Sequence, residues 1–457
     1  MTVLAERTHT SARMTARQKL ILVLLLGSQF MLAVDFSILN VALPVIGSGL
    51  GFALADLQWV ATTFALAAAG FTLLFGRIAD LFGRRRLFLA GMALLGLSSL
   101  AGGLATSPGM LLAARVAQGL ATAIVTPAGL SLLTTSFREG PLRERALGLN
   151  GALMSAGFTS GAILGGLLTD LLSWRWAFFI NVPVALAVLL AAPAVLAESR
   201  QEERPKIDVP GAITVTGGLL ALVYGLTRAG EHGFADPLGL GALAAGLVLL
   251  VVFWFVERRA AYPLVPVSIL ARPTVTWGNL AGLLAFATET SLVFLLTLYL
   301  QKVLGYSALA TGLAFGVLGV GTVIGGVVAP RVLSRVGNRG ALLAGFAVQG
   351  VATASLGLLG ASQGWIWLLL VATFIGGIGN MVAIVGFMVT ATSGLPDSEQ
   401  GLATGLATMT QQVGITMGIP VMSAVATAAM GTVLQGVTVA VLVNAALALA
   451  ATLIRRV

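Results

Sequence analysis

The stretch GRIADLFGRRRLFLAG, residues 76–91, places one aspartate and four arginines between two long apolar runs. Apolar runs of about 20 residues are long enough to cross a membrane as helices. Gly76 and Gly83 permit backbone conformations that other residues avoid, so the stretch predicts a tight turn between two such helices. Its arginines are expected to contact anionic lipid headgroups. Asp80 is the unusual member, because acidic residues contribute little to membrane topology.

The composition extends this interpretation to the whole chain. Of 457 residues, 58% are hydrophobic and 9% are charged, whereas a soluble domain carries about 25% charged residues. The apolar runs are continuous and do not alternate, which favours an all-α membrane protein over a β-barrel. There is no cysteine, and the only histidines are His9 and His232, so neither a disulfide nor a metal site is expected. The net charge of +9 is spread over the breaks between runs, which argues against nucleic acid as a partner.

Fourteen membrane spans are predicted, with both termini in the cytoplasm. The spans begin near residues 20, 57, 87, 110, 146, 176, 209, 237, 274, 308, 341, 366, 401 and 433. In this arrangement 22 of the 26 lysines and arginines face the side of the termini, and such an excess of positive residues is typical of the cytoplasmic side. The polar segment 1–19 is interpreted as a cytoplasmic tail before a retained first span, and not as a signal peptide.

An internal repeat divides the chain. At an offset of 254 residues Gly83 aligns with Gly337, and the stretch 76–91 aligns with PRVLSRVGNRGALLAG, in which Ser334 replaces Asp80. Such similarity predicts two bundles related by an axis along the membrane normal. Segment 201–270 has no counterpart. The predicted layout is therefore 6 + 2 + 6: a six-helix bundle with the tail in 1–200, a two-helix linker in 201–270 and a six-helix bundle in 271–457.

Four motifs resemble those of the major facilitator superfamily, and within it the fourteen-span drug:proton antiporters. Residues 76–86 resemble the motif G-x-x-x-D-x-x-G-R-R/K between spans 2 and 3. DFSILNVALP (35–44) resembles the span 1 motif, RVAQG (115–119) the span 4 motif, and SWRWAFFINVP (173–183) a signature between spans 5 and 6. The resemblance covers the whole chain and implies the major facilitator fold with proton-driven exchange.

The resemblance also implies roles for particular residues. Asp80 would act as a conformational latch that pairs with the other bundle in one access state, together with Gly76, Gly83, Arg84 and Arg85. The alternative is a solvated charge that caps its own helix. Arg115 and Gln118 match residues linked to proton coupling in the family. Arg115 lies only about 8 Å into its span from the outer side, so it could instead extend to the membrane surface.

The span 5 motif departs from the family pattern G-x-x-x-G-P-x-x-G-G. This chain reads GFTSGAILGG, residues 157–166, with Ala162 in place of the proline. The motif glycines are Gly157, Gly161, Gly165 and Gly166. The first three form a stripe that suits close packing of membrane helices. The sequence leaves open whether this stripe also contributes to exchange.

Two acids lie deep in the predicted spans. Asp35 and Glu289 are separated by the repeat offset of 254, and each lies about 22 Å from the cytoplasmic end of its helix. A charge at that depth costs about 2.5–3.5 kcal/mol, so both are predicted to carry protons or bind substrate at one central cavity. The alternative is a neutral acid bonded to a neighbouring helix. Phe36, Phe286 and Phe294 are nearby and suit a lipophilic cation, although phenylalanine is also ordinary filling.

These observations predict a proton-coupled antiporter of the cytoplasmic membrane that exports lipophilic, often cationic, compounds. Its partners would be a small-molecule substrate, protons and membrane lipids; it would act as a monomer without a cofactor, driven by the proton gradient. A dedicated exporter of one antibiotic or metabolite is the alternative. An uptake symporter is less favoured, because the E-x-x-E-R motif is absent from span 1. A channel would not need matched buried acids, an enzyme lacks a visible catalytic pair, and an ATP-driven pump lacks G-x-x-x-x-G-K-[ST].

Overall fold

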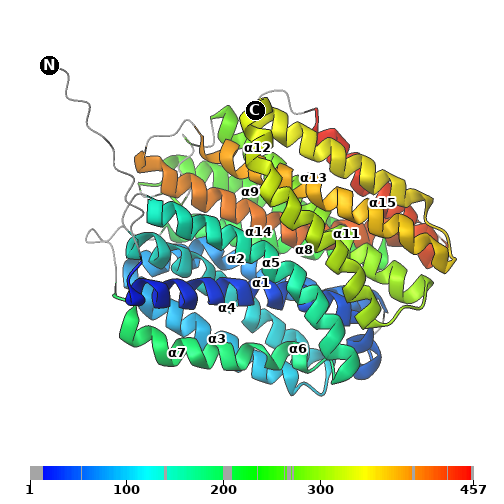
Figure 1. The fold of residues 1–457 in the computed structure, drawn as a ribbon, viewed down its shortest axis with the longest axis horizontal. Coiled ribbons are helices and arrows are strands. Elements are labelled where there is room, and N and C mark those ends of the chain that lie inside the picture. The colour runs from blue at the N-terminus through cyan, green and yellow to red at the C-terminus, as the bar shows by residue number, and fades with distance from the viewer. Residues whose placement is uncertain are drawn as a thin grey trace.

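The structure is a computed structural model that describes residues 14–453, except 53, 138–140, 199–207, 234, 262, 265–268, 270–271, 394–396 and 430. It also leaves out some side chains within helices. All regular secondary structure in the described residues is helical (Figure 1). The amino-terminal helices are α1 (Ala16–Leu50), α2 (Gln58–Phe82), α3 (Arg84–Gly103), α4 (Pro108–Ser136), α5 (Pro141–Leu171), α6 (Trp176–Phe179) and α7 (Asn181–Val195). They are followed by α8 (Val209–His232), α9 (Pro237–Arg259), α11 (Pro273–Leu298), α12 (Ala308–Ser355), α13 (Ile366–Thr392), α14 (Asp397–Ala428) and α15 (Val433–Ala451).

Ten helical segments within the described residues are long and apolar enough to cross a membrane. Helices α2, α5 and α14 fall outside that set although they have 25, 31 and 32 residues. Helix α12 has 48 residues and contains two predicted spans in one continuous element. Its helical geometry is interrupted at Gly337, where φ is 73° and ψ is 172°.

The turn expected from residues 76–91 is present, and its copy is too. Helix α2 ends and α3 begins at Gly83, with φ 112° and ψ 123°, a conformation that favours glycine. Gly337 interrupts α12 at the equivalent place. Gly76, in contrast, makes no bend: it lies inside α2, where an added Cβ would stand 3.4 Å from Pro127 of α4. The sequence was therefore right about Gly83 and wrong about Gly76, which is a packing position.

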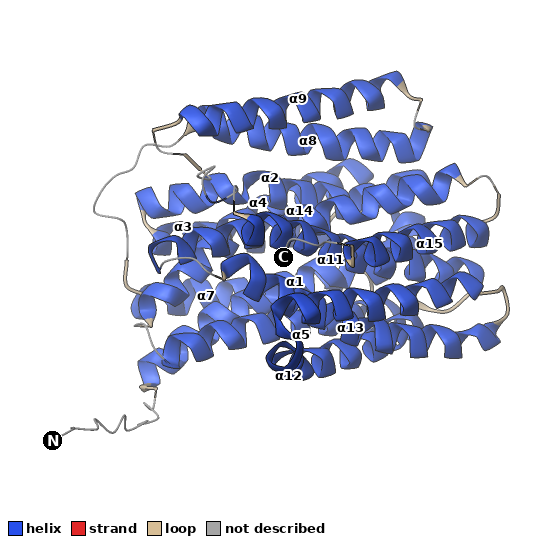
Figure 2. Cartoon of the chain, turned by 90° about the horizontal axis from the view of Figure 1, so that it is seen from above, coloured by secondary structure: helices blue, strands red, loops and turns tan. Residues whose placement is uncertain are grey.

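Helices α8 and α9 lie together along one edge of the molecule (Figure 2). Helix α8 contacts α2 of the amino-terminal half and α14 of the carboxyl-terminal half. On the α2 side, the Thr216 hydroxyl donates to the carbonyl of Gly70 at 2.5 Å. On the α14 side, Val215 and Leu219 pack with Val413. Helix α9 packs on α8, so the pair is attached to both halves through α8.

The two halves also meet where α5 ends and α12 begins. An added Cβ at Gly166 would stand 2.9 Å from the Cα of Leu309. One at Gly312 would stand 2.6 Å from the carbonyl oxygen of Ala162. The backbone amide of Leu309 donates to Asp170 at 2.9 Å. Only glycine allows helices to approach this closely, and the halves are therefore closed against each other at this end.

Candidate functional site

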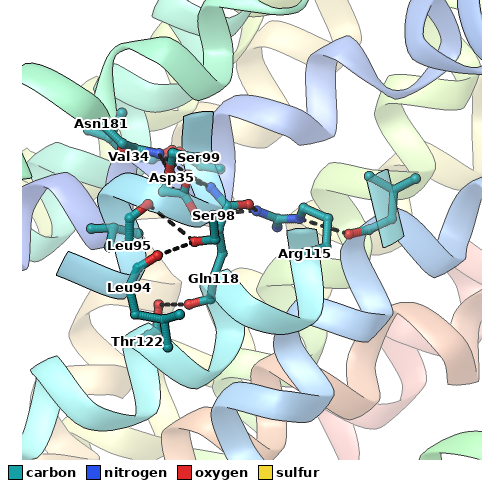
Figure 3. Close-up of polar contacts among 12 residues, drawn as sticks. Val34, Asp35, Leu94, Leu95, Ser98, Ser99, Arg115, Gln118, Thr122 and Asn181 are labelled. Carbon is teal, nitrogen blue, oxygen red and sulfur yellow. Dashed lines mark hydrogen bonds and ion pairs between the residues drawn. The ribbon is translucent and has the colours of Figure 1, made fainter. Parts of the chain in front are cut away.

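Asp35 of α1 is at the centre of a buried polar cluster (Figure 3). Its carboxylate is 0% exposed and accepts hydrogen bonds from two side chains of α4. Arg115 Nη1 donates to Oδ2 at 3.2 Å, and Gln118 Nε2 donates to Oδ1 at 3.1 Å. Asn181 Nδ2, from α7, also donates to Oδ1. The predicted residues Asp35, Arg115 and Gln118 thus meet at one place.

Arg115 is buried and does not extend to the membrane surface. Its side chain is 1% exposed, and its Nε donates to the carbonyl of Val60 at 3.0 Å. Its Nη1 also donates to Gln118 Oε1 at 2.9 Å. The guanidinium carbon stands 4.1 Å from the centre of the Phe64 ring, a cation–π contact. Arg115 is therefore the counter-ion of Asp35, and every partner holds it inside the amino-terminal half.

Two members of this cluster were not anticipated from the sequence. Asn181 and Ser99 are both 0% exposed. The Ser99 hydroxyl accepts from Gln118 at 2.8 Å and from Asn181 at 3.0 Å. Asn181 lies within the motif SWRWAFFINVP, as a polar residue at the start of an apolar run, and that position was the available signal. Nothing comparable marked Ser99.

A cavity of about 640 Å³ lies between the two halves. It is lined by residues of α1, α2, α4, α5, α11, α12, α13 and α14, and extends to Leu130 and Asn150 on one side and Thr392 and Thr408 on the other. These are the parts of the bundle where α4 and α13 end and where α5 and α14 begin. The cavity therefore points away from the end at which α5 and α12 close the two halves.

The structure corrects the expectation that both acids face this cavity. Gln29, Leu32, Ala33 and Phe36 line it from α1, and their spacing marks one face of the helix. Asp35 precedes Phe36 by one residue, which turns it by about 100° toward α4 and α7. Glu289 does line the cavity. The repeat thus places the two acids at matched positions in the chain but in different surroundings.

Glu289 has no hydrogen bond or ion pair with any described residue. It is the only ionisable residue among those that line the cavity in the described part of the chain. The wall around it is mainly apolar and aromatic. No group of three or more His, Asp or Glu residues suited to a metal ion is found within the described residues. No described residue therefore places a positive charge next to Glu289.

The packing of glycines corrects the alignment of the two halves in the fourth span. At the 254-residue offset Phe64 aligns with Leu318. Gly119 packs against the backbone carbonyl of Phe64. Gly377 packs in the same way against Leu318, where an added Cβ would stand 2.8 Å from the carbonyl oxygen. Gly119 and Gly377 are 258 residues apart, so the carboxyl-terminal half carries four more residues, one helical turn, before this point.

This shift changes the equivalent of Arg115. The 254-residue offset pairs it with Leu369, which is fully buried in the apolar core. The corrected offset pairs it with Thr373 and pairs Gln118 with Gly376. Neither replacement carries a charge. The carboxyl-terminal half therefore lacks the arginine, and the residue in its place is polar and small.

Of the three predicted cavity aromatics, two line the cavity. Phe36 does so with its ring centre 5.9 Å from that of Phe64, and Phe286 does so from α11. Phe294 does not: it is 6% exposed and belongs to the apolar core. Phe286, Glu289 and Val293 form one face of α11, and Phe294 is turned away from that face. Phe158 and Phe315 line the cavity and were not predicted.

Among the latch residues, Gly83 and Arg85 contact the end of their own half. The backbone amides of Arg85 and Arg86 donate to the Glu198 carboxylate at 3.0 and 3.2 Å, so Glu198 caps the start of α3. Arg85 Nη1 donates to the carbonyls of Pro193 and Leu196 at 3.3 and 3.1 Å. Arg84 begins α3. The side chain of Asp80 lies outside the described part of the structure, so its pairing with the other half stays a prediction.

The glycines of the span 5 motif pack against α1 and α12. A Cβ added at Gly157 would stand 2.7 Å from the carbonyl oxygen of Phe30. A Cβ added at Gly161 would stand 2.7 Å from the carbonyl oxygen of Val34. Gly165 faces the backbone of Ile38 in the same way, and Gly166 faces α12. The stripe is thus a packing surface between α1 and α5. A role in exchange stays a prediction.

A large cavity between two similar helical bundles is the arrangement of membrane transporters built from repeats. The family profile of the Major Facilitator Superfamily matches residues 25–419, and the chain belongs to this family. It is a multi-pass membrane protein.

Relatives agree with this assignment, and a solved structure agrees with the fold. The chain is 41% identical to the cephamycin export protein CmcT of Amycolatopsis lactamdurans, over 88% of this chain and 83% of that protein. It is 38% identical to the puromycin resistance protein pur8 of Streptomyces alboniger, over 89% and 82%. It is 33% identical to the tetracenomycin C resistance and export protein of Streptomyces glaucescens, over 88% and 75%. The fold matches that of the human organic anion transporter MFSD10 with a TM-score of 0.63 and 16% identity, over 96% of this chain and all of that one.

Proposed function

We propose that this protein exports lipophilic, often cationic, drugs or toxic compounds in exchange for protons. The observation that carries the proposal is the unpaired Glu289 on the wall of a cavity of about 640 Å³. Mainly apolar sites of this size with a few polar groups are typical of small-molecule binding. A cation in the cavity would pair with Glu289 and contact the rings of Phe36 and Phe286. The antibiotic export and resistance proteins among the relatives support the direction of transport.

Asp35 is the proposed coupling residue. Protonation would remove its charge and weaken its attraction to Arg115, which stands 3.2 Å away. The bonds from Gln118 and Asn181 would weaken with it, and these link α1 to α4 and α7. Each proton that moves down a potential of 100 mV supplies about 2.3 kcal/mol. Glu289 is proposed to exchange protons with the substrate more directly, because it lines the cavity.

The proposed topology has fourteen spans in the layout 6 + 2 + 6, with both termini in the cytoplasm. Its support is the length of α2, α5 and α14, and the interruption of α12 at Gly337. In this topology the cavity extends toward the cytoplasm, and α5 and α12 close the opposite end. The structure would then represent an inward-facing state, ready to take up substrate, and rocking of the two halves would give alternating access.

Transport into everted membrane vesicles tests the proposal. A respiring vesicle has an acidic interior, so an antiporter accumulates substrate inside, and a protonophore abolishes this accumulation. Asp35→Asn should stop accumulation of every substrate, because the amide cannot take up a proton. Accumulation by Asp35→Asn at the wild-type rate would contradict the coupling role.

Glu289→Gln should separate substrate binding from coupling. We expect it to reduce transport of a monovalent cation, and to reduce transport of a divalent cation more strongly. Transport of a neutral substrate should be largely unchanged. A neutral molecule has no charge to pair with the carboxylate. Equal loss of all three substrates, at matched expression, would make Glu289 a second coupling residue; no loss would make it structural.

A dedicated exporter of one antibiotic is the second candidate, because several relatives are named for a single compound. A panel of unrelated lipophilic compounds in the same vesicles distinguishes the two, since a dedicated exporter should accumulate only one chemical class. An uptake symporter would instead expel preloaded substrate from vesicles with an acidic interior, because substrate and proton would leave together, so the direction of transport distinguishes the two.

A further inference from the structure

A second, much smaller cavity lies beside Glu289, between α11, α12 and α13. Its volume is about 20 Å³, which is enough for one water molecule or one small ion. We call it the polar chamber; it is lined by Glu289, Leu292, Leu318, Gln349, Thr353, Thr373, Gly376, Gly377 and Asn380. Glu289 and Leu318 line both the chamber and the large cavity, and Glu289 is the charged one of the two.

Two amides at the chamber each donate one hydrogen bond through the nitrogen and have an oxygen without a partner. The Thr288 hydroxyl donates to the carbonyl of Leu284 at 2.7 Å, so it must accept from Gln349 Nε2, at 2.9 Å. Asn380 Nδ2 donates to the carbonyl of Ala285 at 3.2 Å. These bonds fix the orientation of both amides. Gln349 Oε1 and Asn380 Oδ1 are buried without a partner.

A third residue at the chamber also has a buried oxygen without a hydrogen-bond partner. Thr353 Oγ1 is buried and without a partner, and Thr353 is 1% exposed. Gln349 and Asn380 are 2% and 3% exposed. Buried polar atoms are nearly always hydrogen-bonded, and each exception needs a physical reason. Three residues that line one small cavity each carry such an oxygen and lie next to a carboxylate without a described partner, so the chamber offers oxygens to a positive ligand.

The amino-terminal half shows what normally occupies this place. Ser99 aligns with Thr353, and there the hydroxyl is satisfied by Gln118 and Asn181. The corrected alignment places Thr373 and Gly376 where α4 has Arg115 and Gln118, and both line the chamber. The chamber is therefore the space that the Arg115 and Gln118 side chains fill in the other half.

We infer that the polar chamber binds a sodium ion, which serves Glu289 as Arg115 serves Asp35. The carboxylate supplies one negative charge, which a monovalent ion balances. Gln349, Thr353, Thr373 and Asn380 supply neutral oxygens, the ligand type that hard cations prefer. The chamber is too small for an organic cation, which belongs in the large cavity. Sodium and a cationic cargo would compete for the one charge of Glu289, so the ion is expected in the cargo-free protein whatever the direction of transport.

Thermal unfolding of the purified full-length protein tests this inference. Melting temperature is measured in sodium, potassium and choline chloride at equal ionic strength and constant pH. A ligand of the folded state multiplies the folded-to-unfolded ratio by 1 + [Na⁺]/Kd, so the melting temperature should rise most in sodium. Equilibrium dialysis with radioactive sodium should then find about one bound ion per chain.

Two variants should lose the sodium response, and one should keep it. Glu289→Gln removes the charge. Thr353→Val replaces a hydroxyl that has no partner by a methyl group, so in choline chloride it should be at least as stable as wild type. Thr297→Val is the matched control: Thr297 is a buried threonine of α11, away from the chamber, whose hydroxyl donates to the carbonyl of Val293 at 2.9 Å.

Three outcomes would overturn the inference. An equal rise in all three salts would show an ionic-strength effect. No rise in sodium, with no bound ion in dialysis, would mean that the chamber holds only water. A response that Thr353→Val retains would place the ion outside the chamber, either on the cavity side of Glu289 or elsewhere. Failure in any of these ways leaves the vesicle test of drug export unaffected.

Discussion

Neutralising Asp35 should destabilise the protein mainly through the arginine that remains. At 3.2 Å the attraction between Arg115 and Asp35 is about 5 kcal/mol at an effective dielectric constant of about 20. In Asp35→Asn the guanidinium stays buried with Gln118, the Val60 carbonyl and the Phe64 ring. Removing one partner of a buried ion pair typically costs about 3–5 kcal/mol. We expect a loss of this size in the free energy of unfolding.

A double-mutant cycle measures the coupling. Asp35→Asn, Arg115→Gln and the double variant are unfolded by denaturant in detergent micelles, and their free energies of unfolding are compared. The double variant leaves no unpaired charge, so its loss should be smaller than the sum of the single losses by about 3 kcal/mol or more. Glu289→Gln in sodium-free buffer is the control, because Glu289 has no charged partner among the described residues. Additive losses in the cycle would refute the reasoning, as would a loss in Glu289→Gln as large as that in Asp35→Asn.

Two further predictions concern the turns. Gly83→Ala and Gly337→Ala both force alanine into a positive φ, 112° and 73°, which costs about 1–2 kcal/mol. Gly83→Ala should lose more stability in denaturant unfolding, because its Cβ would also stand 2.8 Å from the Glu198 carboxylate. Equal losses in the two variants would contradict that contact. Hydrogen bonds from Arg228 hold the pKa of Asp236 below its usual range, so Asp236 stabilises the fold above its ordinary pKa and loses this effect as the pH falls through the lowered value. Asp236→Asn should flatten the acid side of the profile of melting temperature against pH, and an unchanged acid side would show that the pair contributes nothing.

The turns and helices were predictable because they follow from local rules. Apolar runs of spanning length form helices whatever their neighbours are. Gly83 could be recognised because a charged stretch between two such runs needs a residue that tolerates positive φ. Gly76 misled the prediction, because a glycine inside a helix can also mark close packing, in this case against Pro127. The sequence does not show which of these two uses a glycine has.

The site was predictable only in part, because its members depend on helix rotation. Asp35 and Glu289 stand out as charges in apolar runs, but one residue of difference decides whether an acid faces the cavity. The matching spacing of 254 residues suggested one shared setting, and Asp35 instead lies behind the face that Phe36 presents. Asn181 reaches Asp35 across 146 residues of sequence. The four residues added before the span of Gly377 could be found only from which backbones the glycines touch.

The position of α8 makes the two seams between the halves unequal. The two halves meet along two seams, α2 with α14 and α5 with α12. Helix α8 contacts both α2 and α14, so it covers the first seam on its outer side and separates it from the hydrocarbon of the bilayer. The other seam carries no such cover among the described helices. The two seams are therefore shielded unequally, although the two halves of the molecule are repeats.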